Sequence, residues 1–148
     1  MGQQQLLLLV LGIVIVGLSV VVGIQAFSEN QKKANADSLV NDAIRIASDA
    51  QAWKLKPSAF GGGASADDWD GLTFNQIGYQ SGEQGLHPGD DADDAAYENL
   101  NGIYTLAEDA EELTITATSF DGNDDALNTV VLVVSGTTPG DIVTTINE

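Results

Sequence analysis

The first 27 residues contain an apolar run that a small domain cannot hide. From Leu6 to Ile24 the chain has no charged side chain, and its aliphatic residues are interrupted only by Gly12, Gly17, Ser19 and Gly23. These nineteen residues would extend over roughly 28 Å as an α-helix, which is close to the hydrocarbon thickness of a bilayer. The segment is therefore long enough to cross a membrane as one helix.

A removable secretory signal is one alternative for this segment. Such signals begin with basic residues and have an apolar run of about 7 to 15 residues. Here the first basic residue is Lys32, and the apolar run is longer. Cleavage after Ala26 would remove the segment, but the pattern better fits an element that stays in the mature chain.

The following segment continues the helix with a different pattern. Residues 28–56 contain no Pro or Gly, and their apolar residues recur at helical spacing. The resulting stripe comprises Leu39, Ala43, Ile46, Ala50 and Trp53, widened by Val40, Ile44 and Ala47. Pro57 and the glycine run 61–63 are expected to end the helix.

Together the two segments predict one helix from near Gln5 to Lys56, about 50 residues and roughly 75 Å long. Its first half is apolar all round, and its second half is apolar on one face. The remaining part of the chain, about 90 residues, is too small to bury a helix of that length. The apolar half must therefore contact lipid or other copies of the chain.

The C-terminal part of the chain predicts a small antiparallel sheet. Four β-rich runs, GIYTLAE, ELTITATSF, NTVVLVVSG and DIVTTINE, are separated by turn-forming residues. Leu113, Ile115 and Ala117 alternate with threonines, so one face is expected to be buried. The predicted fold is α+β, in which the stripe from Leu39 to Trp53 packs on a four-stranded meander.

The region between the helix and the sheet is rich in acidic and turn-forming residues. A short strand is predicted there at Leu72–Ile77. Trp69, Phe74 and Tyr79 are expected to hold the region against the core, because large aromatic side chains bury well.

The charge balance limits the possible partners. The chain has 22 acidic and 5 basic residues and a formal net charge of −17. Such a charge opposes direct binding of nucleic acid phosphates. Because 43% of the residues are hydrophobic and well patterned, the acidity indicates a folded protein that stays hydrated in concentrated salt rather than a disordered chain. A fold that is fully stable at low ionic strength would contradict this halophilic interpretation.

Few residues in the sequence are candidates for catalysis or metal binding. There is no cysteine, and the single histidine, His87, lies in a turn-rich segment, so a catalytic triad or an imidazole metal site is not expected. Asp121, Asn123 and Asp125 have oxygen ligands spaced as at the start of a calcium loop, but the closing Glu of an EF-hand is missing. Calcium binding and a solvated acidic turn are the two alternatives there. We expect no other cofactor and no enzymatic activity.

This organisation resembles that of type IV pilins and pseudopilins. In that family a short leader ending in Gly is followed by an apolar half-helix, an amphipathic half-helix and a small antiparallel sheet. The corresponding segments here are 1–2, 3–27, 28–56 and 57–148. The resemblance implies that a prepilin peptidase cleaves between Gly2 and Gln3. The family's glutamate at the fifth position of the mature chain is replaced here by Leu7.

The resemblance also implies the function and the partners. The apolar half-helix would hold the precursor in the inner membrane and, with the pilus assembly machinery, would later pack against other copies in the core of a helical filament at the cell surface. The residues expected at these contacts are Leu6, Leu9, Ile13, Val16, Val20, Ile24 and Phe27. Two alternatives remain open: a pseudopilin of a secretion system, and a single-pass membrane-anchored acidic binding domain.

Overall fold

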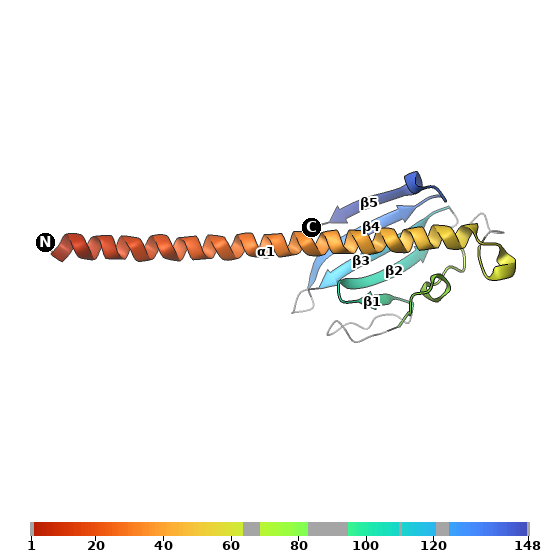
Figure 1. Ribbon diagram of the computed structural model, residues 1–148, viewed down its shortest axis with the longest axis horizontal. Helices are drawn as coiled ribbons and strands as arrows, with labels where there is room; N and C mark the ends of the chain where they lie inside the picture. Colours follow the sequence, from red (N-terminus) through yellow and green to blue (C-terminus); the bar gives the residue numbers. More distant parts are fainter. Residues whose placement is uncertain (1, 64–68, 83–94, 110, 121–124, 148) are drawn as a thin grey trace. The chain divides into compact units, whose positions relative to one another are not determined.

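A computed structural model describes residues 2–63, 69–82, 95–109, 111–120 and 125–147. It contains one α-helix, α1 (Gly2–Leu55), and a five-stranded antiparallel sheet (Figure 1). The strands follow one another in the sheet in chain order. They are β1 (Tyr97–Asn99), β2 (Gly102–Glu108), β3 (Leu113–Phe120), β4 (Ala126–Val134) and β5 (Ile142–Asn147). The predicted α+β fold is confirmed.

The chain divides into two compact units. Residues 1–34 form the first unit, and residues 35–148, here called the head, form the second. The helix α1 contributes to both, because it begins at Gly2 and ends at Leu55. It matches the helix predicted from near Gln5 to Lys56.

The hydrophobic core of the head lies between the second half of α1 and one face of the sheet. From α1 it receives the predicted stripe, of which Leu39, Ala43 and Ala50 are fully buried. The sheet contributes alternate residues of its central strands, including Ile115 and Leu132. In Figure 1 this part of α1 lies across the sheet face. The prediction is wrong for one member of the stripe, Ile44, which is 40% exposed because it lies at the margin of the packed face.

The helix ends where the sequence indicates. Pro57 has an extended conformation, and Gly61 adopts a left-handed one with φ 79°. The chain then turns back over the last turn of the helix, since the Gly63 N–H donates to the Trp53 carbonyl at 3.1 Å and the Trp53 indole N–H donates to the Gly61 carbonyl at 3.0 Å. A Cβ atom at Gly63 would lie 2.5 Å from the Trp53 ring, so only glycine allows this approach.

The strand predicted at Leu72–Ile77 is wrong. Phe74–Ile77 forms a 3₁₀ helix, and Gly78 ends it with φ 89°. The Thr73 N–H donates to the Gln76 side-chain carbonyl at 3.1 Å, so a local hydrogen bond closes the turn in place of strand pairing.

The aromatic residues of the same region behave as expected. Trp69 and Phe74 are buried in the core, and Tyr79 packs against it. The Lys54 ammonium lies 4.1 Å from the centre of the Trp69 ring, which adds a cation–π contact.

The sheet has one strand more than the sequence predicts. β1 is three residues long and pairs with β2, with Tyr97 opposite Tyr104. Its backbone pairing is supported by ring contacts, since the Tyr97 ring centre lies 5.7 Å from that of Tyr104 and 5.8 Å from that of Phe74. A strand this short has no detectable alternation, which is why the sequence does not reveal it.

Candidate assembly surface

The apolar half of α1 exposes all its large side chains. The sixteen aliphatic and aromatic residues from Leu6 to Phe27 are each between 50% and 67% exposed. By length and composition, α1 is the one helix in the described part of the chain that could cross a membrane. This segment holds most of the exposed large hydrophobic side chains of the described residues, and we call it the candidate assembly surface.

The residues predicted to make assembly contacts lie within this surface. They occur at spacings of three or four and so share one side of the helix: Leu6, Leu9, Ile13, Val16, Val20, Ile24 and Phe27. The opposite side is equally apolar and exposed, with Leu8 at 66% and Val22 at 63%. The structure places the predicted stripe on the surface but does not distinguish it from the other sides.

The shape of the segment suits packing against further helices. An open and mostly apolar groove on its surface is lined by Gln3, Leu6, Leu7, Val10, Leu11 and Val14. Such grooves accept the side-chain ridges of a neighbouring helix. A Cβ atom added at Gly12, Gly17 or Gly23 would meet nothing within 4 Å. Among the described residues, no contact therefore requires glycine at these positions, although each glycine costs the helix about 1 kcal/mol relative to alanine.

The predicted processing site lies at the start of α1. Gly2 and Gln3 are exposed residues of its first turn. The first N–H groups of a helix lack carbonyl partners within the helix, so this turn opens at low cost. The geometry is compatible with access by a peptidase, and cleavage itself stays a prediction.

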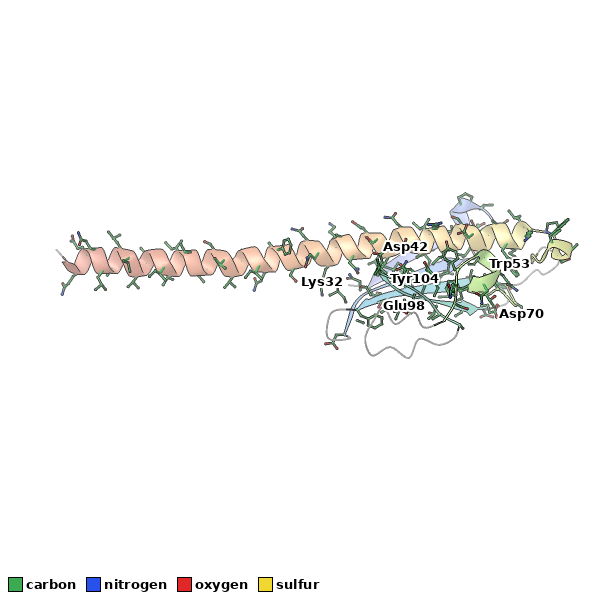
Figure 2. All side chains as sticks on the ribbon, turned by 60° about the horizontal axis from the view of Figure 1, so that its bottom comes forward. Lys32, Asp42, Trp53, Asp70, Glu98 and Tyr104 are labelled. Atoms are coloured by element: carbon green, nitrogen blue, oxygen red, sulfur yellow. The ribbon has the colours of Figure 1, made fainter. Side chains whose placement is uncertain are left out.

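A polar cluster centred on Asp42 fastens α1 to the sheet. The Asp42 carboxylate accepts hydrogen bonds from the side-chain amides of Asn99 at 3.0 Å and Asn101 at 2.8 Å, and from the Tyr104 hydroxyl at 2.9 Å. Figure 2 shows Asp42 and Tyr104 next to each other between helix and sheet. We call these four residues the Asp42 cluster. This cluster is not predicted from the sequence, in which its one signal is a carboxylate at the margin of the apolar stripe.

The cluster changes the acidity of its members. Burial raises the pKa of Asp42, but the hydrogen bonds from Asn101, Asn99 and Tyr104 and the charge of Arg45 outweigh it, so the pKa lies below its ordinary value. Burial, followed by the hydrogen bond to Asp42, raises the pKa of the Tyr104 hydroxyl above its ordinary value. At neutral pH the carboxylate is thus charged and the phenol is protonated, as the hydrogen bond requires.

We expect the Asp42 cluster to stabilise the head above acidic pH. Because the folded pKa is lower than the unfolded one, the contribution is complete above the unfolded pKa of about 3.9 and is lost as the pH falls through the folded pKa. Asp42→Asn should lower the free energy of unfolding by about 2 kcal/mol at pH 7, because a neutral acceptor forms weaker hydrogen bonds.

Denaturant unfolding of the full chain in detergent, followed by tryptophan fluorescence, measures this contribution. The difference between the wild type and Asp42→Asn should stay constant from pH 7 to about 5 and shrink below about pH 4. A difference that is independent of pH would contradict the role of the ionised carboxylate.

Further polar contacts hold the second half of α1 on the sheet. The Gln51 side-chain amide donates to the carbonyls of Gly136 and Thr138, both at 2.9 Å. The Tyr79 hydroxyl donates to the Asp49 carboxylate at 2.7 Å. Together with the Asp42 cluster, these contacts attach α1 to the rest of the head at Asp42, Asp49 and Gln51.

The predicted calcium site cannot be followed in the structure. Asp121 and Asn123 lie outside the described residues, as does His87, and only Asp125, just before β4, is described. Among the described residues, no group of three or more His, Cys, Asp or Glu side chains could hold a metal ion. Calcium binding in this loop stays a prediction.

Comparison with known proteins yields no match, either to a protein-family model, to a curated protein or to a solved structure.

Proposed function

We infer that this chain is the structural subunit of a pilus-like filament, which it builds by packing its apolar half-helix against those of other copies. Before assembly, the same half-helix would hold the subunit in the membrane. The single observation behind this inference is the candidate assembly surface: sixteen large apolar side chains on one helix, none of them covered.

The size of this surface argues that something covers it. Full burial of one Val, Leu, Ile or Phe side chain is worth roughly 1.5 to 3 kcal/mol. Even half of that for sixteen residues exceeds about 10 kcal/mol, which is comparable to the whole stability of a typical domain. The surface would therefore not stay in water.

The same surface can face lipid first and other helices later. Lipid tails and aliphatic side chains are similarly apolar, so helix association inside a membrane depends on close packing rather than on further burial from water. Gly12, Gly17 and Gly23 would allow such packing, and no atom of the described residues lies within 4 Å of a Cβ added there. Copies inserted in one orientation would give a filament whose helices all run in the same direction.

The charge of the head favours its exposure to water on the outside of the filament. Twenty-one of the 22 acidic residues belong to residues 35–148, whereas residues 1–27 contain no charge. A polymer with the apolar segments inside and the acidic heads outside keeps every head hydrated. We therefore propose a cell-surface location and a structural rather than a catalytic role.

Shearing cells that produce the full chain, and imaging the supernatant, tests the proposal. Filaments composed of this chain are expected, with the mass of the subunit showing whether cleavage occurs after Gly2. Recovery of the chain only as monomers in the membrane fraction would overturn the filament and would favour the membrane-anchored acidic domain. Short rods that stay with the cell envelope would favour the pseudopilin.

A glycine substitution separates filament packing from membrane insertion. Gly17→Leu should leave the chain in the membrane, since leucine is apolar and stabilises a helix by about 1 kcal/mol relative to glycine. It should nevertheless lower the yield of sheared filaments about tenfold or more, because the larger side chain keeps neighbouring helices apart. Val22→Leu, an enlargement on the side of the helix opposite the predicted contact residues, is the control. Equal filament yields from both variants would contradict close packing at Gly17.

A further inference from the structure

The strand β5 forms an open edge of the sheet. It is last in the strand order and, in the described part of the chain, it pairs with β4 alone. In an edge strand, alternate residues direct their N–H and C=O groups away from the sheet. All residues of β5 after Ile142 are exposed. The edge therefore offers a row of backbone donors and acceptors to another strand.

This edge lacks the usual protection. Natural edge strands are blocked by lysines, prolines, bulges or inward-pointing charges, or they are very short. The β5 sequence IVTTIN contains no charge and no proline, and its register with β4 runs without interruption from Ile142 to Asn147. The opposite edge differs, since β1 has only three residues and contains Glu98.

The surface beside this edge is also free of charge. On the sheet face turned away from α1, the strand registers define three rows of directly paired residues from β2 to β5. The rows are Ala107, Thr114, Val133, Val143; then Thr105, Thr116, Val131, Thr145; and then Ile103, Thr118, Thr129, Asn147. In a head with so many acidic residues, the stretch that would pair, Ile142 to Asn147, carries no charge itself, and Asp141 and Glu148 flank it in the sequence.

The edge strand is held in place at its start. The Asp141 carboxylate accepts hydrogen bonds from the Thr138 N–H at 2.9 Å and from the Thr138 hydroxyl at 2.7 Å. The Ser135 N–H donates to the Asp141 carbonyl at 3.1 Å. These bonds close the connection between β4 and β5, so the edge is already ordered before a partner strand binds. Little conformational entropy of β5 would therefore be lost on binding.

We propose that β5 pairs antiparallel with β5 of a second copy, joining two sheets edge to edge and thereby linking neighbouring filaments. The proposal rests on the proposed function, because the filament supplies the many aligned copies. Antiparallel pairing of identical strands relates the two copies by a two-fold axis. Subunits whose helices run in one direction have no such axis within their filament, so the paired copy belongs to another filament that runs the opposite way.

The small size of the contact determines when it matters. A pair of six-residue strands covers much less than the roughly 1,200 Å² of a stable interface. Single subunits are therefore expected to stay apart. Along two filaments the same weak contact repeats, and each contact holds the next pair of heads at high local concentration. The overall affinity between two filaments is therefore much higher than that of one contact.

A matched pair of threonine substitutions tests the proposal in filaments of the full chain. Thr145 and Thr105 are both exposed and lie at opposite ends of the same row, Thr145 on the β5 edge and Thr105 on β2. Thr145→Lys places two like charges near each other across the joined edge and should weaken each contact about fivefold. Over many contacts, filament bundles should separate into single filaments in electron micrographs, whereas Thr105→Lys should leave the bundles intact.

Amide hydrogen exchange adds a second measurement. In wild-type bundles, the outward N–H groups of residues 142–147 should exchange more slowly than in the dispersed Thr145→Lys filaments, while the amides of β3 should be unchanged. Bundles that persist in Thr145→Lys, bundles lost equally in Thr105→Lys, or equal protection of β5 in dispersed filaments would each overturn edge pairing. In all these outcomes filaments form, so the proposed function would stand. A wild-type chain that forms no filaments would overturn both.

Discussion

Ile15→Asp is expected to abolish filament formation and to weaken membrane insertion. Ile15 lies in the middle of the apolar segment and is 55% exposed in the isolated chain. An aspartate at the centre of a membrane helix costs about 3 kcal/mol on insertion scales, which lowers the ratio of inserted to uninserted chain about a hundredfold. In a filament core the same carboxylate would be buried without a partner, and this adds a further penalty. Membrane fractionation and counts of sheared filaments measure the two effects.

A control at Gln31 separates the charge from its position. Gln31→Asp adds the same charge to the same helix beyond the apolar segment, at an exposed position. It should leave insertion and filament yield within about twofold of the wild type, since exposed substitutions away from special contacts have small effects. Normal filaments from Ile15→Asp would contradict burial of the candidate assembly surface and, with it, the proposed function.

Leu39→Ala is expected to cause the largest loss of stability in the head. Leu39 is fully buried in the core, where it packs close to Gly102 on β2. Removing a buried leucine side chain costs about 2 to 5 kcal/mol, because the transfer energy is lost and a cavity remains. Denaturant unfolding of the full chain in detergent measures the loss. Trp53 and Trp69, both in the core, supply the fluorescence signal.

The same substitution at an exposed leucine is the control. Leu100 is 85% exposed, and Leu100→Ala should change the free energy of unfolding by less than about 0.5 kcal/mol. Comparable losses for both variants would mean that α1 does not pack on the sheet through Leu39.

Periodicity predicted the main elements of the fold. Apolar spacing in residues 28–56 identified the stripe that α1 buries, and Pro57 with the following glycines identified the end of the helix. Runs of β-favouring residues between turn-forming residues identified β2 to β5, and alternation identified the buried face of β3. The errors fall where short-range contacts decide the structure. Phe74–Ile77 forms a 3₁₀ helix because a local hydrogen bond from Thr73 closes it. The short strand β1 exists because tyrosine rings and β2 hold it.

The bounds of the candidate assembly surface could be predicted from the sequence, because an uninterrupted apolar run is recognisable without any tertiary contact. Its sides are all equally exposed, so the structure does not single out one stripe.

The Asp42 cluster was missed because it depends on residues that are distant in the chain. Its donors, Asn99, Asn101 and Tyr104, are more than fifty residues away in the chain, so no local pattern connects them to Asp42.

Sequence alone determined that this protein has a long helix with an apolar first half and a one-sided second half, since hydrophobic spacing acts over neighbouring turns. Only the tertiary structure decided which polar groups fasten that helix to the sheet and which strand is left at an open edge. Those features depend on the order and register in which distant segments pair, and side-chain periodicity along one segment does not contain that information.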